Sequence, residues 1–352
     1  MNRIPVAILG ATGAVGQRMI QLLANHPWFE IAVLTGSDRT IGRPYGELVR
    51  WVLDGNPPAH IANMIVQPSD KVADVALALS ALPTDAARAY EELWATQTAV
   101  CSNASAFRMT PDVPLIIPEV NPEHVTLIDD QRKNRGWRGA LVTNPNCSVI
   151  GVAMAVKPLA DTFGIAQMQV ATLQAVSGAG YPGVASLDII DNIIPNIGNG
   201  TEEEKIETEP NKILGTYAAG GISSAHMQIS AQVTRVPVID GHTALLSIKG
   251  QHSMSAHDAI AAIQAYKSPT IVQGLPSAPT QPLVLHDHPE RPQPRRDRDA
   301  GNGMSTSIGR VRSCGINDVR MVVLSHNTIR GAAGGAILNA ELLVAAGYTR
   351  SN

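Results

Sequence analysis

Near the start of the chain, residues 8–16 read Ile8-Leu9-Gly10-Ala11-Thr12-Gly13-Ala14-Val15-Gly16. The apolar residues 5–9 predict a buried strand, and the apolar spacing of residues 17–25 predicts a helix. A glycine turn between a strand and a helix is typical of a dinucleotide site, because glycines let the backbone approach a pyrophosphate at the helix N-terminus. The spacing G-x-x-G-x-x-G is a variant of the usual fingerprint. We predict that a dinucleotide contacts Gly10, Thr12, Gly13, Ala14 and Val15.

The next predicted strand, residues 30–34, bears on which dinucleotide is bound. An NAD site usually places an acidic side chain at the end of this strand, where it holds the ribose 2′-hydroxyl. Here the strand runs into hydroxyl side chains and an arginine, which favour a 2′-phosphate. Asp38 argues the other way, and the arginine has an alternative explanation as a surface charge. We predict NADP, with the 2′-phosphate near Ser37, Arg39 and Thr40.

Further short strands are predicted at residues 74–79, 98–101 and 114–117, and residues 84–96 have helical spacing. Strands that alternate with helices predict an α/β fold with a Rossmann-like, doubly wound parallel sheet. Ligands bind at the carboxyl ends of the strands in such a sheet. Ser80 stands at one of these strand ends, and we expect it near the dinucleotide.

The composition argues against several classes of function. The formal net charge of the 352 residues is −3, which gives no electrostatic case for binding nucleic acid or an anionic membrane. No stretch approaches the roughly 20 apolar residues of a membrane span. Cys101, Cys147 and Cys314 stand far apart and in no metal-ligand spacing, and such a sparse, odd set suits a reducing compartment. We expect a cytoplasmic protein without a metal site.

The most distinctive local pattern is Thr143-Asn144-Pro145-Asn146-Cys147-Ser148, a turn that ends in a lone cysteine. Residues 149–163 are small and apolar and predict a helix, so Cys147 would lie at a helix N-terminus. Unpaired backbone N–H groups favour an anion there, and a thiol at such a place tends to have a lowered pKa. The alternative is that Cys147 is a small buried core residue.

The second half of the chain places charged residues beside two more predicted strands. Residues 168–176 form the first strand, which runs into the glycine-rich residues 177–183. Residues 228–236 form the second, with Arg235 near its end and His242 seven residues further on. A histidine that reaches a cysteine forms a pair suited to nucleophilic catalysis, although a lone histidine is more often structural.

Two other charged groups also have a structural alternative. Residues 201–209 form an acidic helix start that includes Lys205, a pattern usual for a solvated helix face. Arg108 follows a strand end and is either an anion contact or a surface charge. The mixed-charge residues 267–303 predict a loop or an oligomer surface. A late strand at residues 321–324 and a final helix at residues 336–346 complete the chain.

Taken together, these motifs resemble the aspartate-β-semialdehyde dehydrogenases of the archaeal and fungal branch, over nearly the full length. The segments that carry the resemblance are residues 8–16, 143–148, 178–183, 235–238, 241–243 and 325–335. The cysteine and histidine segments are specific in combination, whereas the glycine fingerprint alone is not. The resemblance implies an NADP-binding domain at residues 1–146, completed by residues 327–352. It implies an α+β catalytic and dimerisation domain at residues 147–326.

The family reduces L-aspartyl-4-phosphate to L-aspartate-4-semialdehyde with NADPH, through a thioester, in lysine, threonine and methionine biosynthesis. The resemblance implies that Cys147 is the nucleophile and that His242 is the acid and base. Asn146 and Gln174 would position the acyl group. The nicotinamide side of the cofactor would contact Ser177, Gly178, Asn327 and Thr328.

The resemblance also implies how the substrate is held. Arg235 matches the arginine that grips the α-carboxylate, and Lys205 and Arg108 match the phosphate-binding cations. An acyl phosphate is negative at both ends, so cations at both ends of a pocket would orient it. The substrate ammonium would meet Glu202 or Glu209, of which we favour Glu209.

Several alternatives accompany this interpretation. Ala244 stands where the family usually has an acidic residue. A relative of the same fold could reduce another acyl donor, such as malonyl-CoA or N-acetylglutamyl phosphate. A regulatory protein that binds NADP without catalysis is the alternative from another class. The family forms dimers of dimers through the catalytic-domain sheet, so we expect a homodimer or homotetramer, with small-molecule substrate and phosphate as the other partners.

Overall fold

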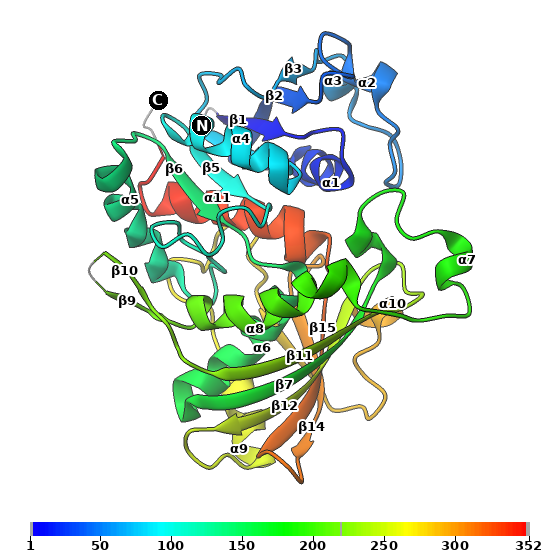
Figure 1. Ribbon diagram of the computed structural model, residues 1–352, viewed down its shortest axis with the longest axis vertical. Helices are drawn as coiled ribbons and strands as arrows, with labels where there is room; N and C mark the ends of the chain where they lie inside the picture. The colour runs from blue at the N-terminus through cyan, green and yellow to red at the C-terminus, as the bar shows by residue number, and fades with distance from the viewer. Residues whose placement is uncertain (1–2, 219, 350–352) are drawn as a thin grey trace.

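The computed structural model describes residues 3–218 and 220–349, which fold around two β-sheets (Figure 1). The N-terminal sheet is parallel and six-stranded, in the order β3-β2-β1-β4-β5-β6. Its strands are β1 (Ile4–Leu9), β2 (Phe29–Gly36), β3 (Gln67–Pro68), β4 (Leu77–Ser80), β5 (Ala99–Ser102) and β6 (Ala140–Thr143). The chain order reverses between β1 and β4, as in a doubly wound sheet. The predicted fold class is therefore confirmed for this half.

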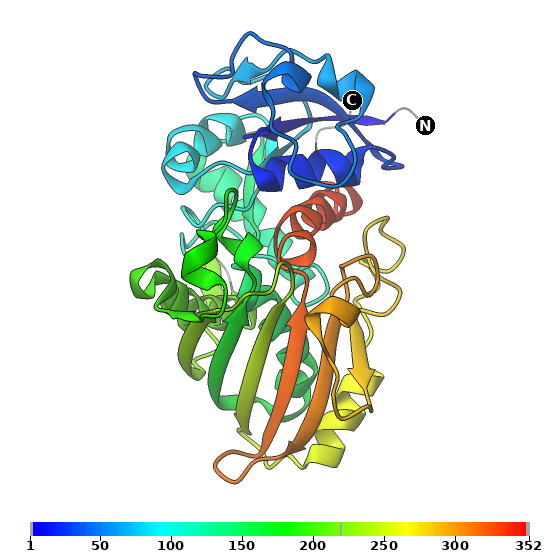
Figure 2. The ribbon, with the colours of Figure 1, turned by 90° about the vertical axis from the view of Figure 1, so that its right-hand side faces the viewer.

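Helices cover both faces of the N-terminal sheet, because its strands are apolar on both sides. Val6 and Ile8 pack in a cluster with α1 (Ala14–Leu23) and α11 (Gly334–Ala345), whereas Ala7 and Leu9 pack in a second cluster with α4 (Thr84–Ala95). Figure 2 shows the C-terminal helix, in red, lying against this sheet. Helix α11, near the end of the chain, thus packs against the N-terminal half.

One predicted strand is wrong. Residues 114–117 make only an isolated bridge, in which Leu115 pairs with Thr143. The chain bends there because Pro114 has no N–H for a ladder and residues 118–126 turn into a short helix. The edge strand of the sheet is β6, which pairs with β5 and which we did not predict from the sequence.

The second sheet is mixed and seven-stranded, in the order β13-β14-β15-β12-β7-β11-β8. It is covered on one side by α6 (Cys147–Phe163), α8 (Thr201–Ile213) and α9 (Ala256–Ala265) (Figure 1). The strands are β7 (Ile165–Gln174), β8 (Ile194–Pro195), β11 (Gln228–Arg235), β12 (His242–Gly250), β13 (Leu283–His286), β14 (Thr306–Ser313) and β15 (Val319–Ser325).

The strands of the second sheet alternate between buried and exposed residues. In β12, Leu246 and Ile248 lie in the core beneath the helices, while Leu245 is 43% exposed on the other face. This alternation is typical of a sheet with one face packed by its own chain. The segment predicted as a loop at residues 267–303 supplies the edge strand β13 and the helical turn α10 (Pro294–Asp297).

Short elements make the connections between the two sheets and along their edges. Within the described ranges, none of the helices is both long enough and apolar enough to cross a bilayer. The short elements are α2 (Tyr45–Leu48), α3 (Ala59–Ala62), α7 (Ser186–Ile189), β9 (Thr216–Ala218), β10 (Gly221–Ser223), the 3-10 turns Pro122–Thr126, Val176–Ala179 and Ile197–Gly200, and the π-helical turn Ile329–Ala333.

Candidate functional site

A cavity of about 360 Å³ opens where the two halves of the molecule meet. It lies at the carboxyl ends of the parallel strands, which is where α/β sheets bind ligands. Both halves contribute to its wall, and so does the turn before the final helix. Among the predicted site residues, those that line it are Ala14, Val15, Arg108, Asn146, Cys147, Ser177, Gly178, Glu202, Lys205, Asn327 and Thr328.

Cys147 is the first residue of α6, as the sequence predicts. Asn146 is the N-cap residue, and its side-chain oxygen accepts hydrogen bonds from the N–H groups of Ser148 and Val149. This cap satisfies two donors of the first turn and holds the helix start rigidly. The sulfur of Cys147 lies 3.2 Å from Nε2 of His242, so the structure brings together the two residues of the expected catalytic pair.

The ring of His242 is held by the backbone of Ala175. The Ala175 N–H donates to Nδ1 of His242 at 3.0 Å, so Nδ1 must carry a lone pair. In the neutral imidazole the proton is then on Nε2, which faces Cys147. Burial lowers the pKa of His242 to about 3, and the charge of Arg235 adds to this effect. His242 is therefore a neutral ring with an Nε2–H donor.

The expected lowering of the Cys147 pKa is wrong for this structure. Burial raises the pKa of the thiol to about 12, and the nearby negative charge of Glu202 acts in the same direction. Arg108, Arg235 and Lys205 oppose the rise without cancelling it. The helix N-terminus does stabilise a thiolate. Removing a charged sulfur from water, however, costs more free energy than the first turn of a helix provides. The thiol is therefore protonated at neutral pH.

Glu202 is the acidic side chain of the cavity wall. Its Oε1 accepts a hydrogen bond from the side chain of Asn146 at 2.7 Å and a longer one from Gln174 at 3.5 Å. Its Oε2 lies 3.2 Å from the ammonium of Lys205. Glu202 and Lys205 sit three residues apart on α8, one turn of the helix, and therefore face the same cavity.

Glu209 occupies a different position from the one we expected. It does not line the cavity, and only 2% of its surface is exposed. Its Oε1 lies 2.9 Å from Nη1 of Arg108, and its Oε2 accepts the N–H of Asn146 at 2.7 Å. Both carboxylate oxygens are thus occupied within the protein. The geometry does not support our preference for Glu209 over Glu202 as the partner of a substrate ammonium.

Arg235, Gln174 and His242 lie directly behind the cavity wall. Nη1 of Arg235 donates to the carbonyl oxygen of Ala175 at 2.8 Å. A Cβ atom on Gly178 would come within 2.8 Å of this nitrogen and within 2.9 Å of the His242 ring. The absence of a side chain at Gly178 therefore lets both buried groups approach the cavity.

A second cavity of about 410 Å³ adjoins the N-terminus of α1. Gly10 adopts a φ of +76°, and a Cβ there would come within 2.9 Å of the Ala81 carbonyl oxygen, so the turn requires glycine. No side chain caps α1, whose first turn also lacks an acid, so its N–H groups remain suited to a phosphate. The predicted residues that line this cavity are Gly10, Thr12, Gly13 and Ser37.

The other residues predicted for the cofactor lie at the margin of this second cavity. Thr40 donates its hydroxyl to the carbonyl of Ser37, and Arg39 is exposed beside it. Ser80 is buried, and its hydroxyl accepts the N–H of Leu82. The wall also includes Asp38, Ser69, Asp70 and Tyr90, of which the sequence reading missed the last three. Ser69 and Asp70 lie in the loop after β3 and Tyr90 lies on α4, and the three follow no motif.

Ala244, where the family pattern usually has an acid, lies in the apolar cluster of the second sheet. It is only 6% exposed and pairs with Thr172 on β7 and Val323 on β15. An acidic side chain at this position would enter the hydrophobic core beneath the helices. In this chain, the position where the family usually has an acidic residue is therefore part of the packed core.

Comparison with known proteins agrees with this arrangement of two domains. Residues 5–128 match the family model of the semialdehyde dehydrogenase NAD binding domain, and residues 156–330 match that of the semialdehyde dehydrogenase dimerisation domain. The aspartate-semialdehyde dehydrogenase of Archaeoglobus fulgidus is 48% identical, over 97% of this chain and 98% of its own.

A solved structure and a second curated relative extend the comparison. The structure of aspartate semialdehyde dehydrogenase with NADP from Candida albicans superposes with a TM-score of 0.91 and 39% identity, covering 99% of this chain and 100% of that one. The malonyl CoA reductase (NADP) of Metallosphaera sedula is 40% identical, over 98% of each chain.

Proposed function

The chain belongs to the aspartate-semialdehyde dehydrogenase family, and on that premise we propose that it reduces L-aspartyl-4-phosphate to L-aspartate-4-semialdehyde with NADPH. The observation that carries the proposal is the 3.2 Å approach of the Cys147 sulfur to Nε2 of His242, at the wall of a cavity that also exposes Arg108 and Lys205. A nucleophile, a proton donor and two cations suit an acyl phosphate better than an uncharged substrate.

In the proposed reaction, the Cys147 sulfur attacks the acyl carbon, the bond to phosphate breaks and a thioester forms, while the thiol proton leaves with the phosphate. Bound NADPH supplies a hydride to the thioester carbon, and it would be held by the α1 N-terminus and by Gly10, Thr12, Gly13 and Ser37. The resulting thiohemiacetal then releases the aldehyde and restores the thiol. Cys147 begins and ends the cycle protonated, which agrees with its raised pKa.

We assign the stabilisation of the developing oxyanion to His242. The N–H groups of Ser148 and Val149 are occupied by the N-cap, and that of Asn146 is occupied by Glu209. The Nε2–H of His242 points toward the sulfur, so a tetrahedral centre on that sulfur would lie within its reach. The proton that the reduction consumes comes from solvent, because a neutral ring that gave up its Nε2–H would become an imidazolate.

The substrate's charged groups have partners on the same wall. We propose that Glu202 meets the substrate ammonium, and that Lys205 and Arg108 hold the phosphate. Arg235 would hold the α-carboxylate from behind Gly178, with Asn146 and Gln174 beside the acyl group. The arrangement of Glu202 supports its role, because it can accept from an ammonium while its second oxygen stays near Lys205.

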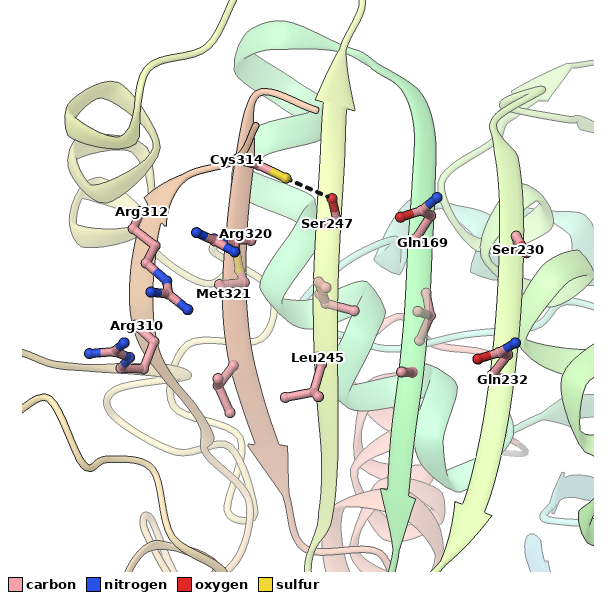
Figure 3. A pocket seen from close by; sticks show the side chains of 14 residues that line it. Gln169, Ser230, Gln232, Leu245, Ser247, Arg310, Arg312, Cys314, Arg320 and Met321 are labelled. Atoms are coloured by element: carbon pink, nitrogen blue, oxygen red, sulfur yellow. Dashed lines mark hydrogen bonds between the residues drawn. The ribbon is translucent and has the colours of Figure 1, made fainter. Parts of the chain in front are cut away.

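We further propose that the chain forms a homodimer, or a homotetramer built from dimers, through the uncovered face of the second sheet. This face holds a depression of about 580 Å³ with Leu245, Gln169 and three arginines around it (Figure 3). The family model that matches this half carries the name dimerisation domain, which supports a second copy as the occupant. The three free cysteines, Cys101, Cys147 and Cys314, support a reducing compartment such as the cytoplasm.

The test is NADPH formation from L-aspartate-4-semialdehyde and inorganic phosphate, followed at 340 nm. We expect turnover that depends on phosphate, falls to background in Cys147→Ser, and is weaker with NAD. Cys314→Ser is the matched control, since it makes the same atomic change at a sulfur that lines the depression on the second sheet and not the cavity with Cys147; its assembly is checked by light scattering. Activity that survives Cys147→Ser, or that runs on malonyl-CoA and NADPH instead, would overturn the proposal.

A further inference from the structure

Helix α8 carries two Glu-x-x-Lys turns, Glu202 with Lys205 and Glu209 with Lys212. The two turns are seven residues apart, which places them on the same side of the helix about two turns from each other. The first turn lines the cavity. The second lies beneath it, with Glu209 only 2% and Lys212 only 8% exposed. Such deep burial of two charged side chains calls for a reason, because each must be compensated inside the protein.

Lys212 is compensated by the loop that carries Arg108. Its ammonium donates to three backbone carbonyls, those of Arg108 at 2.7 Å, Thr110 at 2.8 Å and Val113 at 2.7 Å. An ammonium has three donors, so Lys212 uses all of them on a single loop. That loop belongs to the N-terminal half, whereas α8 packs on the second sheet. Lys212 thereby fastens the Arg108 loop to the other half of the molecule.

Glu209 joins the same loop to the nucleophile. One carboxylate oxygen contacts the guanidinium of Arg108, and the other accepts the N–H of Asn146, the residue before Cys147. Nη2 of Arg108 donates to the carbonyl of Asn103 at 2.8 Å. The Nε of Arg108 is buried and, among the residues that the structure describes, has no hydrogen-bond partner. At the cavity wall, Arg108 is thus held by Glu209 and by the carbonyl of Asn103, and its Nε–H donor is unused among the described residues.

We propose that Glu209 and Lys212 are positioning residues, which hold Arg108 at a set place relative to Cys147 so that it can bind the phosphate group. The inference rests on the proposed function, since Glu209 and Lys212 would support a residue of the same site. The carboxylate of Glu209 fixes the guanidinium, and the ammonium of Lys212 fixes the backbone beneath it. Neither side chain touches the substrate.

The rival role for Glu209 is direct contact with the substrate ammonium, and the two roles change different constants. If Glu209 acts through Arg108, its loss weakens phosphate binding and leaves the semialdehyde largely unaffected. If it contacts the ammonium, its loss weakens binding of the semialdehyde, which carries the amino group. Measuring KM for each substrate separately therefore decides between them.

The first variant is Glu209→Gln, which keeps the shape but removes the charge. An amide oxygen can accept from Asn146 or from Arg108, but the amide NH₂ then faces the other donor. We expect KM for phosphate to rise about tenfold or more, as expected for the loss of a charge-assisted contact. KM for the semialdehyde should stay within about twofold of the wild type by the same reasoning. Glu204→Gln, an exposed change on the same helix, is the matched control and should alter neither constant.

A second variant and a double variant guard against a purely structural effect. Lys212→Met should raise KM for phosphate in the same direction, while Lys133→Met at an exposed site should not. Arg108→Met should cost less in phosphate KM when Glu209 is already Gln than when it is Glu, because the two residues act as one unit. Thermal unfolding and NADP binding are measured for each variant to establish that it is folded.

The outcomes separate cleanly. A rise in KM for phosphate alone in Glu209→Gln and in Lys212→Met, together with a non-additive effect of Glu209→Gln and Arg108→Met, would establish the positioning role. A rise in KM for the semialdehyde alone in Glu209→Gln, independent effects of Glu209 and Arg108, or unchanged constants in folded variants would each overturn it. A wild-type enzyme without phosphate-dependent turnover would overturn the proposed function and this inference with it. That result is distinct from an active wild type with unaffected variants.

Discussion

The two sheets of this molecule differ in how many of their faces the chain itself covers. In the N-terminal sheet, neighbouring residues such as Ile8 and Leu9 are both fully buried, each in a different apolar cluster. In the second sheet, Leu246 is buried at 2% exposure while its neighbour Leu245 is 43% exposed. The first sheet is thus covered on both faces, whereas one face of the second sheet is left uncovered by the described residues.

This difference between the two sheets explains where the two cavities and the proposed interface lie. The closed sheet holds its loops rigidly at one edge, where glycines and a helix N-terminus form a cofactor cavity. The half-covered sheet contributes its helices α6 and α8 to the cavity with Cys147, and its other face is the one that we propose for assembly. The cavity with Cys147 forms only where the two come together, so it depends on both.

Paired alanine substitutions give the largest expected effect and test the comparison directly. Ile8→Ala and Leu9→Ala should each lower the free energy of unfolding by about 2–5 kcal/mol, because each leaves a cavity in a filled core. Leu246→Ala should cost a similar amount, whereas Leu245→Ala should cost at least about 2 kcal/mol less than Leu246→Ala. Urea denaturation measures all four at a protein concentration low enough to dissociate the proposed assembly, because a second copy would otherwise bury Leu245. Equal losses at Leu245 and Leu246 would show that the second sheet is as closed as the first.

The second-largest expected effect is a loss of kcat on substitution of Gly178, at the junction of the two halves. In Gly178→Ala the new methyl group would push against His242 and Arg235, which displaces the ring from Cys147. Misplacing a catalytic group by about 1 Å can lower kcat about a hundredfold. We expect this loss with little change in melting temperature, since the loop is exposed. Gly221→Ala, where a methyl group would meet no atom within 4 Å, is the control. Full activity of Gly178→Ala would contradict the close approach.

A charge on the uncovered face tests its proposed role in assembly. Leu245→Asp places a carboxylate at the centre of the depression in Figure 3, where a second copy would have to bury it. We expect the mass measured by sedimentation or light scattering to fall to that of a smaller assembly, with the circular dichroism unchanged. Ile316→Asp, 80% exposed and outside the depression, should leave the mass as in the wild type. A mass unaffected by Leu245→Asp would remove this face as the interface.

Much of this could be predicted from sequence where the signal is local. The strand, glycine turn and helix at residues 4–23 follow from apolar spacing, and the helix start at Cys147 follows from the turn before it and the small apolar residues after it. The choice between Glu202 and Glu209 could not be predicted. Both are buried glutamates on one face of α8, and only the packing of the Arg108 loop against the lower turn occupies both oxygens of Glu209 while Glu202 lines the cavity. Long-range packing decides such cases.

The smallest expected effect is the pH dependence of thiol labelling at two cysteines, one in the first sheet and one at the junction of the two halves. Cys101 lies on β5 in the closed sheet, and burial raises the pKa of its thiol. Cys147 lies at the junction, where burial raises the pKa to about 12 even though the sulfur is at a helix N-terminus. A thiol far below its pKa gains thiolate about tenfold per pH unit. The alkylation rate of Cys147 by iodoacetamide should therefore climb by about that factor for each unit between pH 7 and 9, without a plateau.

The measurement is the labelled fraction of each cysteine by peptide mass spectrometry over time. Cys101 serves as the internal control, since its fully buried position should keep it unlabelled throughout. N-acetylcysteine, an exposed thiol, should begin to level off near its ordinary pKa of about 8.5. The low pKa of His242 predicts no inflection near pH 6.5, because the ring stays neutral. A plateau for Cys147 below pH 8 would mean that the helix N-terminus and the surrounding cations outweigh burial, and that the resting nucleophile is a thiolate.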